Sequence, residues 1–302
     1  MAMKVVVAGG TGFLGRPLVE ALRGASHEVA VLTRGAPRHP GEVQWQPQSP
    51  GGDWVRAVDG AHAVINLAGQ PIADRRWSDS RKRTLLSSRL ETTAALARAI
   101  RTAGAPPSTF LSASGIGVYG TSRDESLDET AATGDDFLAR LCGQWEAAAL
   151  DASPMTRVVL LRTGLVLARD GGALPQIALP FRLFIGGRMG TGRQVMSWIH
   201  LDDWIALVLW AMSNASASGP LNLTAPNPVS NSEFSATLGR VLHRPSFIAA
   251  PAFALRLALG EMADAMLLGG QRAVPAAALR GGFAFRYPTL EPALKEIYSR
   301  RP

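Results

Sequence analysis

The chain has 302 residues, of which 47% are hydrophobic and 18% charged, and its formal net charge is +7. These values are typical of a globular protein with a sizeable core, arranged as one large domain or two lobes. Arginine supplies nearly all of the positive charge, and no basic stripe interleaved with aromatic residues accompanies it. We therefore predict no nucleic-acid partner.

Cys142 is the only cysteine, which excludes an intrachain disulfide and leaves no cysteine cluster for zinc. No signal peptide fits the start of the chain, because the first predicted strand begins at Lys4. The most apolar late run, Trp204 to Met212, is too short to cross a bilayer. We expect a cytoplasmic protein with no membrane partner and no metal, and the sequence leaves its oligomeric state open.

The first predicted elements are a strand over Lys4 to Ala8, a glycine turn that reads GGTGFLG, and a helix. This order is the context of a dinucleotide-binding fingerprint. Gly9 would allow the sharp exit from the strand, and Gly12 would let backbone N–H groups approach a pyrophosphate. Gly15 would let the helix pack close to the sheet. The alternative is a glycine-rich turn without a ligand.

The helix after this turn has an amphipathic pattern, and its N-terminus offers unpaired N–H groups and a positive dipole end to phosphates. Its predicted apolar face consists of Phe13, Leu14, Leu18, Val19 and Leu22. The residues of the turn that we assign to the cofactor are Gly9, Thr11, Gly12, Phe13, Leu14 and Gly15.

A second predicted strand, Glu28 to Thr33, indicates which cofactor is preferred. A free ribose 2′-OH usually meets an acidic residue about 20 positions after the glycines. Here that place holds Thr33, Arg34 and Gly35, without an acid. Because the planar fork of arginine pairs with phosphate oxygens, Arg34 suits a 2′-phosphate, and we predict NADP(H) rather than NAD(H). The alternative is a surface arginine after a strand.

Strands and helices continue to alternate through the first half of the chain. The predicted strands are Gly41–Trp45, Ala63–Leu67, Ser108–Ser112 and Arg157–Leu161, and the predicted helices are Ser78–Arg101 and Phe137–Leu150. Repeated βα units with apolar strands favour an α/β fold with a doubly wound parallel sheet of the Rossmann type.

Closely spaced glycines after Leu167 indicate loops and a second lobe. Later predicted elements are strands at Val195–His200 and Leu221–Thr224 and helices at Asp202–Met212, Ser230–Leu242 and Leu290–Tyr298. We predict an NADP-binding Rossmann domain over residues 1–170, rejoined by residues of about 195–225. A smaller α-rich C-terminal lobe over residues 171–302 would hold the substrate.

Five motifs occur in the order in which extended short-chain dehydrogenases/reductases carry them, and the chain resembles the NAD-dependent epimerase/dehydratase type of that superfamily. They are GGTGFLG at 9–15, NLAG at 66–69, SASGIGVYG at 112–120, RTGLVL at 162–167 and WIHLDD at 198–203. RRW at 75–77, SRLETT at 88–93, Trp145-Glu146 and a C-terminal module of the DUF1731 type point to a narrower branch. That branch is labelled "epimerase family protein" and sometimes "cell division inhibitor".

The resemblance implies further cofactor contacts. Leu67, Ala68 and Gly69 would line the adenosine-ribose side, at the carboxyl end of the fourth strand. Arg89 stands where relatives often have an Asn close to the cofactor, and Thr84 would point toward the same crevice; the alternative is that both are solvated helix residues. Leu165 and Val166 would cover the nicotinamide, or else they belong to the ordinary core.

The catalytic pattern departs from the superfamily, whose members use a Ser or Thr, a Tyr, and a Lys four residues after the Tyr. Aligned on Glu146, the Tyr position holds Leu138 and the Lys position holds Cys142. The remaining candidates are Tyr119 and Ser114. Tyr119 would act only if a cation such as Arg89 or Arg75 lowered its pKa, and the alternative is that it packs under a loop.

Two functions remain open at this point. The first is an NADP(H)-binding, epimerase-like oxidoreductase that acts on an unidentified small molecule; Arg75, Arg76 and Trp77 would suit an anionic or planar substrate. The second is a catalytically silent NADP(H)-binding sensor or regulator, which the missing Tyr and Lys favour. A division regulator rests on a label alone.

Overall fold

A seven-stranded parallel sheet forms the centre of the computed structural model, which describes residues 2–49, 51–121 and 123–299. Its strands are β1 (Lys4–Ala8), β2 (Glu28–Thr33), β3 (Glu42–Gln44), β4 (Ala63–Asn66), β5 (Thr109–Gly115), β7 (Arg157–Thr163) and β11 (Gly219–Leu223). They lie in the order β11-β7-β5-β4-β1-β2-β3, and each neighbouring pair is parallel. The predicted Rossmann-type fold is confirmed.

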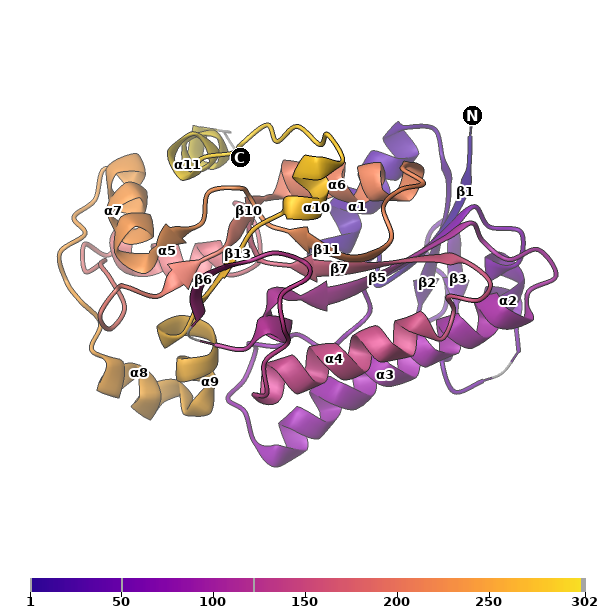
Figure 1. Cartoon of the computed structure of the whole chain (residues 1–302), viewed down its shortest axis with the longest axis horizontal. Helices are drawn as coiled ribbons and strands as arrows, with labels where there is room; N and C mark the ends of the chain where they lie inside the picture. Colours follow the sequence, from indigo (N-terminus) through magenta and orange to yellow (C-terminus); the bar gives the residue numbers. More distant parts are fainter. Residues whose placement is uncertain (1, 50, 122, 300–302) are drawn as a thin grey trace.

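The sheet is buried on both faces, because the side chains of each strand alternate between two apolar layers. In β1, Val5 and Val7 belong to one layer, while Val6 and Ala8 belong to the other. Helices α1 (Gly15–Gly24) and α6 (Leu201–Ser213) cover the first face; α3 (Asp79–Thr102), α4 (Phe137–Leu150) and the short α2 (Asp53–Val58) cover the second (Figure 1).

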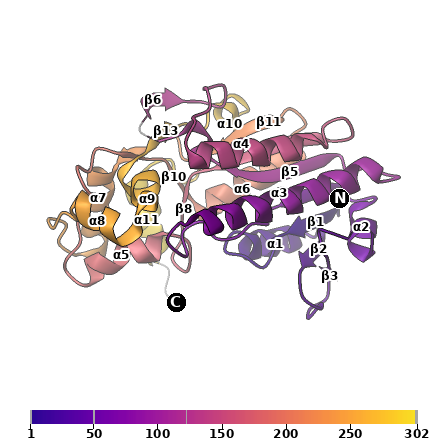
Figure 2. The same cartoon turned by 90° about the horizontal axis from the view of Figure 1, so that it is seen from below.

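A helical lobe lies at one end of the sheet, and both views show it there (Figures 1 and 2). Its apolar core includes Trp198 and Phe234 and joins helices α5 (Leu174–Arg182), α7 (Asn231–Leu242) and α11 (Leu290–Ser299). Helices α8 (Ala252–Leu259) and α9 (Glu261–Ala263) and a π-helical turn (Asp264–Leu268) lie beside it, and α10 (Ala276–Arg280) is near the sheet.

Small strand pairs connect this lobe to the sheet. They are β8 (Leu165–Leu167) with β10 (Trp198–His200), β9 (Val195–Met196) with β12 (Val229–Ser230), and β6 (Arg123–Leu127) with β13 (Gln271–Ala273). Residues 201–223 return to the main sheet as α6 and β11. The division of the chain near residue 170 stays a prediction.

Most predicted elements of the first half have the expected bounds, and β2 and α4 match residue for residue. The helix predicted after the glycine turn starts later, because Phe13 and Leu14 precede α1. The single strand predicted at Val195–His200 is two strands. Ser197 interrupts it, donating a hydrogen bond to the Gln271 carbonyl and accepting one from the Ala273 N–H.

The WIHLDD motif fastens the last part of the chain to α6. His200 caps this helix through Nδ1, which accepts from the Asp202 N–H, and its Nε2–H donates to Glu296 in α11 at 2.9 Å. Asp203 accepts from the N–H groups of both Arg286 and Tyr287 at 2.8 Å. His200 is therefore a hydrogen-bonded structural residue.

A buried ion pair links α4 to β7. The Arg162 guanidinium donates from Nε and Nη2 to the two carboxylate oxygens of Glu146, both at 2.8 Å, and the two side chains are less than a tenth exposed. Burial alone would lower the pKa of Arg162, but the hydrogen bonds and the charge of Glu146 raise it overall. Arg162 also donates to the Tyr119 hydroxyl and to the Glu129 carbonyl.

We predict that Glu146→Gln destabilises the fold by about 3–5 kcal/mol, since it leaves the Arg162 charge buried without its carboxylate. The matched control is Glu291→Gln, which removes an exposed carboxylate paired with Arg240 and Lys295 and should cost no more than about 1 kcal/mol. Denaturant unfolding of the three purified proteins measures both values. Equal stability of the two variants would contradict the prediction.

Candidate cofactor site

The glycine turn after β1 touches the end of β4, at the point where the strand order reverses. Gly9 has φ +79°, and a Cβ there would lie 2.7 Å from the Leu67 carbonyl carbon and 2.9 Å from the Ala68 nitrogen. A Cβ on Gly15 would lie 2.2 Å from the Gly9 carbonyl oxygen. Both positions require glycine, and their close packing brings the two strand ends together at the crevice where doubly wound sheets bind ligands.

Gly12 has a different environment, which leaves one side of the turn open. A Cβ there would meet only the Gly9 carbonyl oxygen, at 3.3 Å, and Thr11, Gly12 and Phe13 are exposed. Helix α1 starts with Leu14 as its N-cap, without a side-chain cap and without an acidic residue in the first turn. The positive end of the helix is thus left to an outside anion, as a pyrophosphate site requires.

The end of β2 lies beside this turn, because Leu32 is in register with Ala8. The Thr33 hydroxyl donates to the Gly35 carbonyl at 3.0 Å and shapes the bend that carries Arg34. Arg34 is exposed, and within the described residues its guanidinium has no hydrogen-bond or ion-pair partner. The position fits a 2′-phosphate, and the contact itself stays a prediction.

Asn66 shapes the NLAG turn from below. Its side-chain amide donates to Thr93 Oγ1 in α3 at 2.8 Å, and its carbonyl oxygen accepts from the Ala68 N–H at 3.1 Å. The Leu67 N–H donates to the Ala8 carbonyl, which ties this turn to β1. Leu67 and Ala68 are half-buried and Gly69 is exposed, so the predicted contact residues border the crevice.

Arg89 lies under the NLAG turn and is only 9% exposed, so the alternative that it is solvated is wrong. It donates from Nη1 to the Leu85 carbonyl at 2.9 Å and from Nη2 to the Gln70 carbonyl at 3.0 Å. Its Nε is buried and has no partner among the described residues. Burial lowers its pKa, although arginine keeps its charge at neutral pH. This cation adjoins Gly69, where an added Cβ would lie 3.3 Å from the guanidinium carbon.

Phe13 connects the turn to the segment after β8. A Cβ on Gly171 would lie 2.4 Å from its ring, and one on Gly172 would lie 2.8 Å from it, so the ring packs on this backbone. Val166 is buried and Leu165 half-buried in β8. The structure brings this segment to the glycine turn, and the proposed cover over the nicotinamide stays a prediction.

Thr84 is exposed on α3, and its hydroxyl donates to the Ser80 carbonyl at 3.1 Å. It lines a pocket of about 390 Å³ that also includes Gln70, the residue directly after the NLAG turn. A hollow of about 420 Å³ lies at the opposite, amino-terminal ends of β1 and β4, near Lys4 and His62. Ligands of open α/β sheets bind at the carboxyl ends, so the larger hollow is not our candidate.

Tyr119 and Ser114, the predicted catalytic residues, lie together in the buried polar cluster around Arg162. The Tyr119 hydroxyl donates to Asn222 Oδ1 at 2.8 Å and accepts from Arg162, and its ring is fully buried. Burial raises its pKa, and the charge of Arg162 offsets this only in part. The neighbouring cation is therefore Arg162 rather than Arg89 or Arg75. The Ser114 hydroxyl donates to Glu146 at 2.7 Å.

The face of α4 that would carry a Tyr–Lys dyad is apolar and closely packed. A Cβ on Gly117 would lie 3.2 Å from the Leu138 Cβ, and one on Gly115 would lie 3.7 Å from the Cys142 sulfur. Burial, and then the charge of Glu146, raise the pKa of the Cys142 thiol to about 11. At neutral pH the thiol is therefore protonated and unreactive.

The sequence patterns assigned no role to Asn66, Glu146 and Arg162, although each has a clear role in the structure. Each belongs to a motif that marks the family resemblance, which was the available signal. Their partners are 16 to 43 positions away in the chain, and no local pattern indicates such pairs.

The fold and the glycine cradle define a class, the NAD(P)-binding Rossmann proteins of the epimerase type. The family model described as the NAD-dependent epimerase/dehydratase family matches residues 5–223, and a domain of unknown function, DUF1731, matches residues 250–297. The chain belongs to the NAD-dependent epimerase/dehydratase family. It is 45% identical over 297 residues to the epimerase family protein ML0860 of Mycobacterium leprae, covering 98% of this chain and 96% of that protein.

Among the solved structures that are similar, two match nearly all of this chain. Human epimerase family protein SDR39U1, crystallised with NADPH, has a TM-score of 0.91 and 38% identity, covering 99% of this chain and 100% of that one. A nucleoside-diphosphate sugar epimerase from Corynebacterium glutamicum has a TM-score of 0.81 and 35% identity, covering 98% of this chain and 58% of that one.

We predict that Gly12→Val abolishes binding of NADPH while the fold stays intact. The added side chain meets little protein, yet it occupies the open side of the turn that a pyrophosphate needs. Fluorescence titration with NADPH measures binding, and circular dichroism checks the fold. The control is Gly24→Val at the other end of α1, where a Cβ meets nothing within 4 Å. Unchanged NADPH binding by Gly12→Val would show that the turn is not the pyrophosphate site.

Proposed function

We propose that this chain is an NADP(H)-dependent, epimerase-like oxidoreductase that acts on a small molecule. The observation that carries the proposal is the open cradle at Gly12, with an uncapped helix end and the unpaired Arg34 beside it. The NADPH in the similar human structure supports the same cofactor here. A cytoplasmic location and the absence of nucleic-acid and membrane partners stay predictions; no helix of the described ranges is long and apolar enough to cross a membrane.

The chain's own groups would divide the binding as follows. Backbone N–H groups of Phe13 and Leu14 bind the pyrophosphate, since the Gly12 N–H already donates to the Gly9 carbonyl, and Arg34 binds the 2′-phosphate. The turn at Leu67 to Gly69, held by Asn66, orients the ribose side. When bound, NADP(H) supplies or accepts a hydride.

Arg89 would place a fixed positive charge at the crevice, near the position where the superfamily has its lysine. Arg89 lies over the ring of Trp145, three residues after Cys142 on α4, at 5.0 Å, and its charge partly offsets the rise in the pKa of the Cys142 thiol. Because Arg89 bonds to carbonyls and to no carboxylate among the described residues, no described negative charge cancels its own. Such a charge favours the ribose hydroxyl and phosphate oxygens of a bound cofactor.

The described side chains give the least support to the proton-transfer step. Tyr119 would have to break its hydrogen bonds to Asn222 and Arg162 before it could reach a substrate, and its raised pKa makes ionisation harder. Ser114 is bound to Glu146. These contacts favour the second candidate, a silent NADP(H)-binding sensor, as the alternative to an enzyme.

We predict that the protein binds NADPH more tightly than NADH and that Arg34→Ala removes this preference. The variant loses a charge-assisted contact worth about 1.5–3 kcal/mol with NADPH and almost nothing with NADH. Titration of both cofactors against both proteins gives the four dissociation constants. Arg101→Ala, an exposed arginine at the end of α3, controls for the change in net charge. Equal affinities for the two cofactors in the parent protein would refute the assignment of Arg34.

We also predict that nucleotide sugars are not epimerised at rates near the enzyme median of about 10 s⁻¹. The double variant Leu138→Tyr with Cys142→Lys should not restore the activity, because the arginine-rich substrate loop at Arg75 and Arg76 also differs from the superfamily pattern. Chromatography of sugar products after incubation with the protein and its cofactor provides the measurement. Rapid epimerisation that disappears in Tyr119→Phe would instead make Tyr119 the acid/base.

A further inference from the structure

A basic pocket opens beside the NLAG turn, at the start of α3. It has a volume of about 390 Å³ and is lined by Gln70, Arg75, Arg76, Ser78, Ser80, Arg81 and Thr84. Three arginines and three hydroxyls thus surround one hollow, and Gln70 joins it to the turn that we assign to the cofactor. This combination of forked cations and hydroxyl donors is suited to the oxygens of an anion.

The charges in this pocket are not balanced by the protein. Arg81 is the paired member: it donates to Asp74 and to the Pro71 carbonyl, and its Nε is buried without a partner among the described residues. Arg75 lies 3.7 Å from the same Asp74 and is 77% exposed. Asp74 therefore serves two arginines, and Asp79, between the lining residues Ser78 and Ser80 in the first turn of α3, adds a second negative charge. The three arginines of the pocket still exceed these two acids by one charge.

Arg76 forms the boundary with the C-terminal lobe. Its Nη1 donates to the Leu257 carbonyl in the last turn of α8 at 3.3 Å, and a Cβ on Gly260 would lie 3.0 Å from its Nε. Lys82 pairs with Glu261 in α9 nearby, which is a second contact between α3 and this part of the chain. A neutral carbonyl is the only described hydrogen-bond acceptor of Arg76, so a charged ligand group would compete well for its other donors.

We propose that this pocket binds the anionic group, a phosphate or a carboxylate, of the small molecule on which the chain acts. Arg75 and Arg76 supply the charge, and Ser78 and Ser80 offer hydroxyl donors. The role as a substrate subsite rests on the proposed function, whereas anion binding by the pocket does not. Because Gln70 directly follows the NLAG turn, a ligand held here extends toward the cofactor crevice.

The test uses Arg75→Gln with Arg76→Gln in the full chain. Inorganic phosphate and malonate are titrated by calorimetry into protein saturated with NADPH, so that the cofactor's own phosphate sites are filled. We expect the parent to bind at least one probe and the double variant to bind it at least about tenfold more weakly. The probe that binds the parent more tightly identifies the anion as phosphate or carboxylate.

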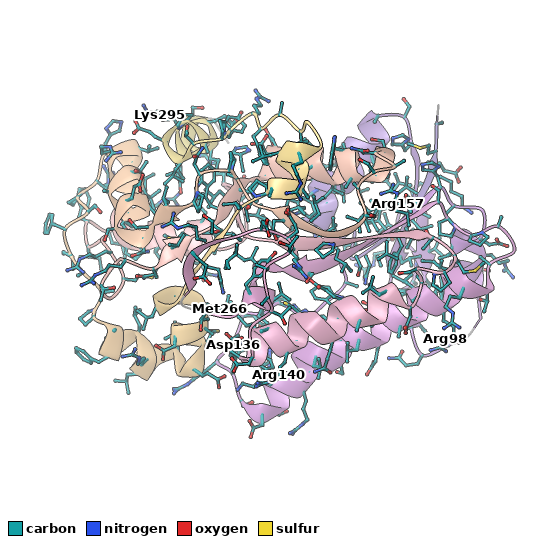
Figure 3. All side chains as sticks on the ribbon, in the orientation of Figure 1. Arg98, Asp136, Arg140, Arg157, Met266 and Lys295 are labelled. Atoms are coloured by element: carbon teal, nitrogen blue, oxygen red, sulfur yellow. The ribbon has the colours of Figure 1, made fainter. Side chains whose placement is uncertain are left out.

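The control is Arg98→Gln with Arg101→Gln, which removes the same charge at the opposite end of α3; Figure 3 labels Arg98 there. This variant should bind the probes as the parent does, and both double variants should keep the parent's affinity for NADPH. The proposal that this pocket binds an anion is overturned if the parent binds neither probe, or if both double variants bind the probes equally weakly. If NADPH itself does not bind, the proposed function fails, and the titration without NADPH still tests the pocket.

Discussion

The position of the proposed cofactor site depends on the close backbone contact between the ends of β1 and β4. A parallel sheet whose order reverses between β1 and β4 directs two connections away from each other and leaves a crevice at their carboxyl ends. Here the two ends touch through Gly9 and the Leu67–Ala68 peptide, at distances that admit no side chain. The Leu67 N–H donates a hydrogen bond to the Ala8 carbonyl, which fixes the register of the two strand ends. The open side of Gly12 and the uncapped start of α1 lie next to this contact.

The helix α4 has a structural role where the superfamily places its proton donor. Cys142 packs against Gly115 at the end of β5 and Leu138 against Gly117 in the turn that follows, and one turn after Cys142, Glu146 holds Arg162 and Ser114. Through Arg162 the same network fixes Tyr119, and through Asn222 it reaches the carbonyls of Leu127 and Val274. A buried network with these partners stabilises one arrangement and resists the opening that proton transfer from Tyr119 requires.

The sequence predicts well those features that depend on neighbouring residues. The apolar strand β1, the glycine turn and the bounds of β2 and α4 all follow from local pattern. The environments of Tyr119 and Arg89 do not. Their partners come from distant parts of the chain, so a tyrosine near the site in sequence lies instead in the core, and a helix arginine that pattern would expose is buried under a turn.

Three kinds of arginine environment separate structural from binding roles in a chain whose net charge is +7. Arg162 has a full carboxylate partner and belongs to the core. Arg34, Arg75 and Arg76 are exposed near the crevice, where an unbalanced charge costs little because water solvates it. Arg89 is the costly case, since two carbonyls and the face of Trp145 at 5.0 Å compensate only part of its desolvation. If the proposed function holds, this buried cation, which has no carboxylate partner among the described residues and adjoins Gly69, would stabilise an anion in the crevice, and that expectation favours binding over packing as the reason for an arginine at this position.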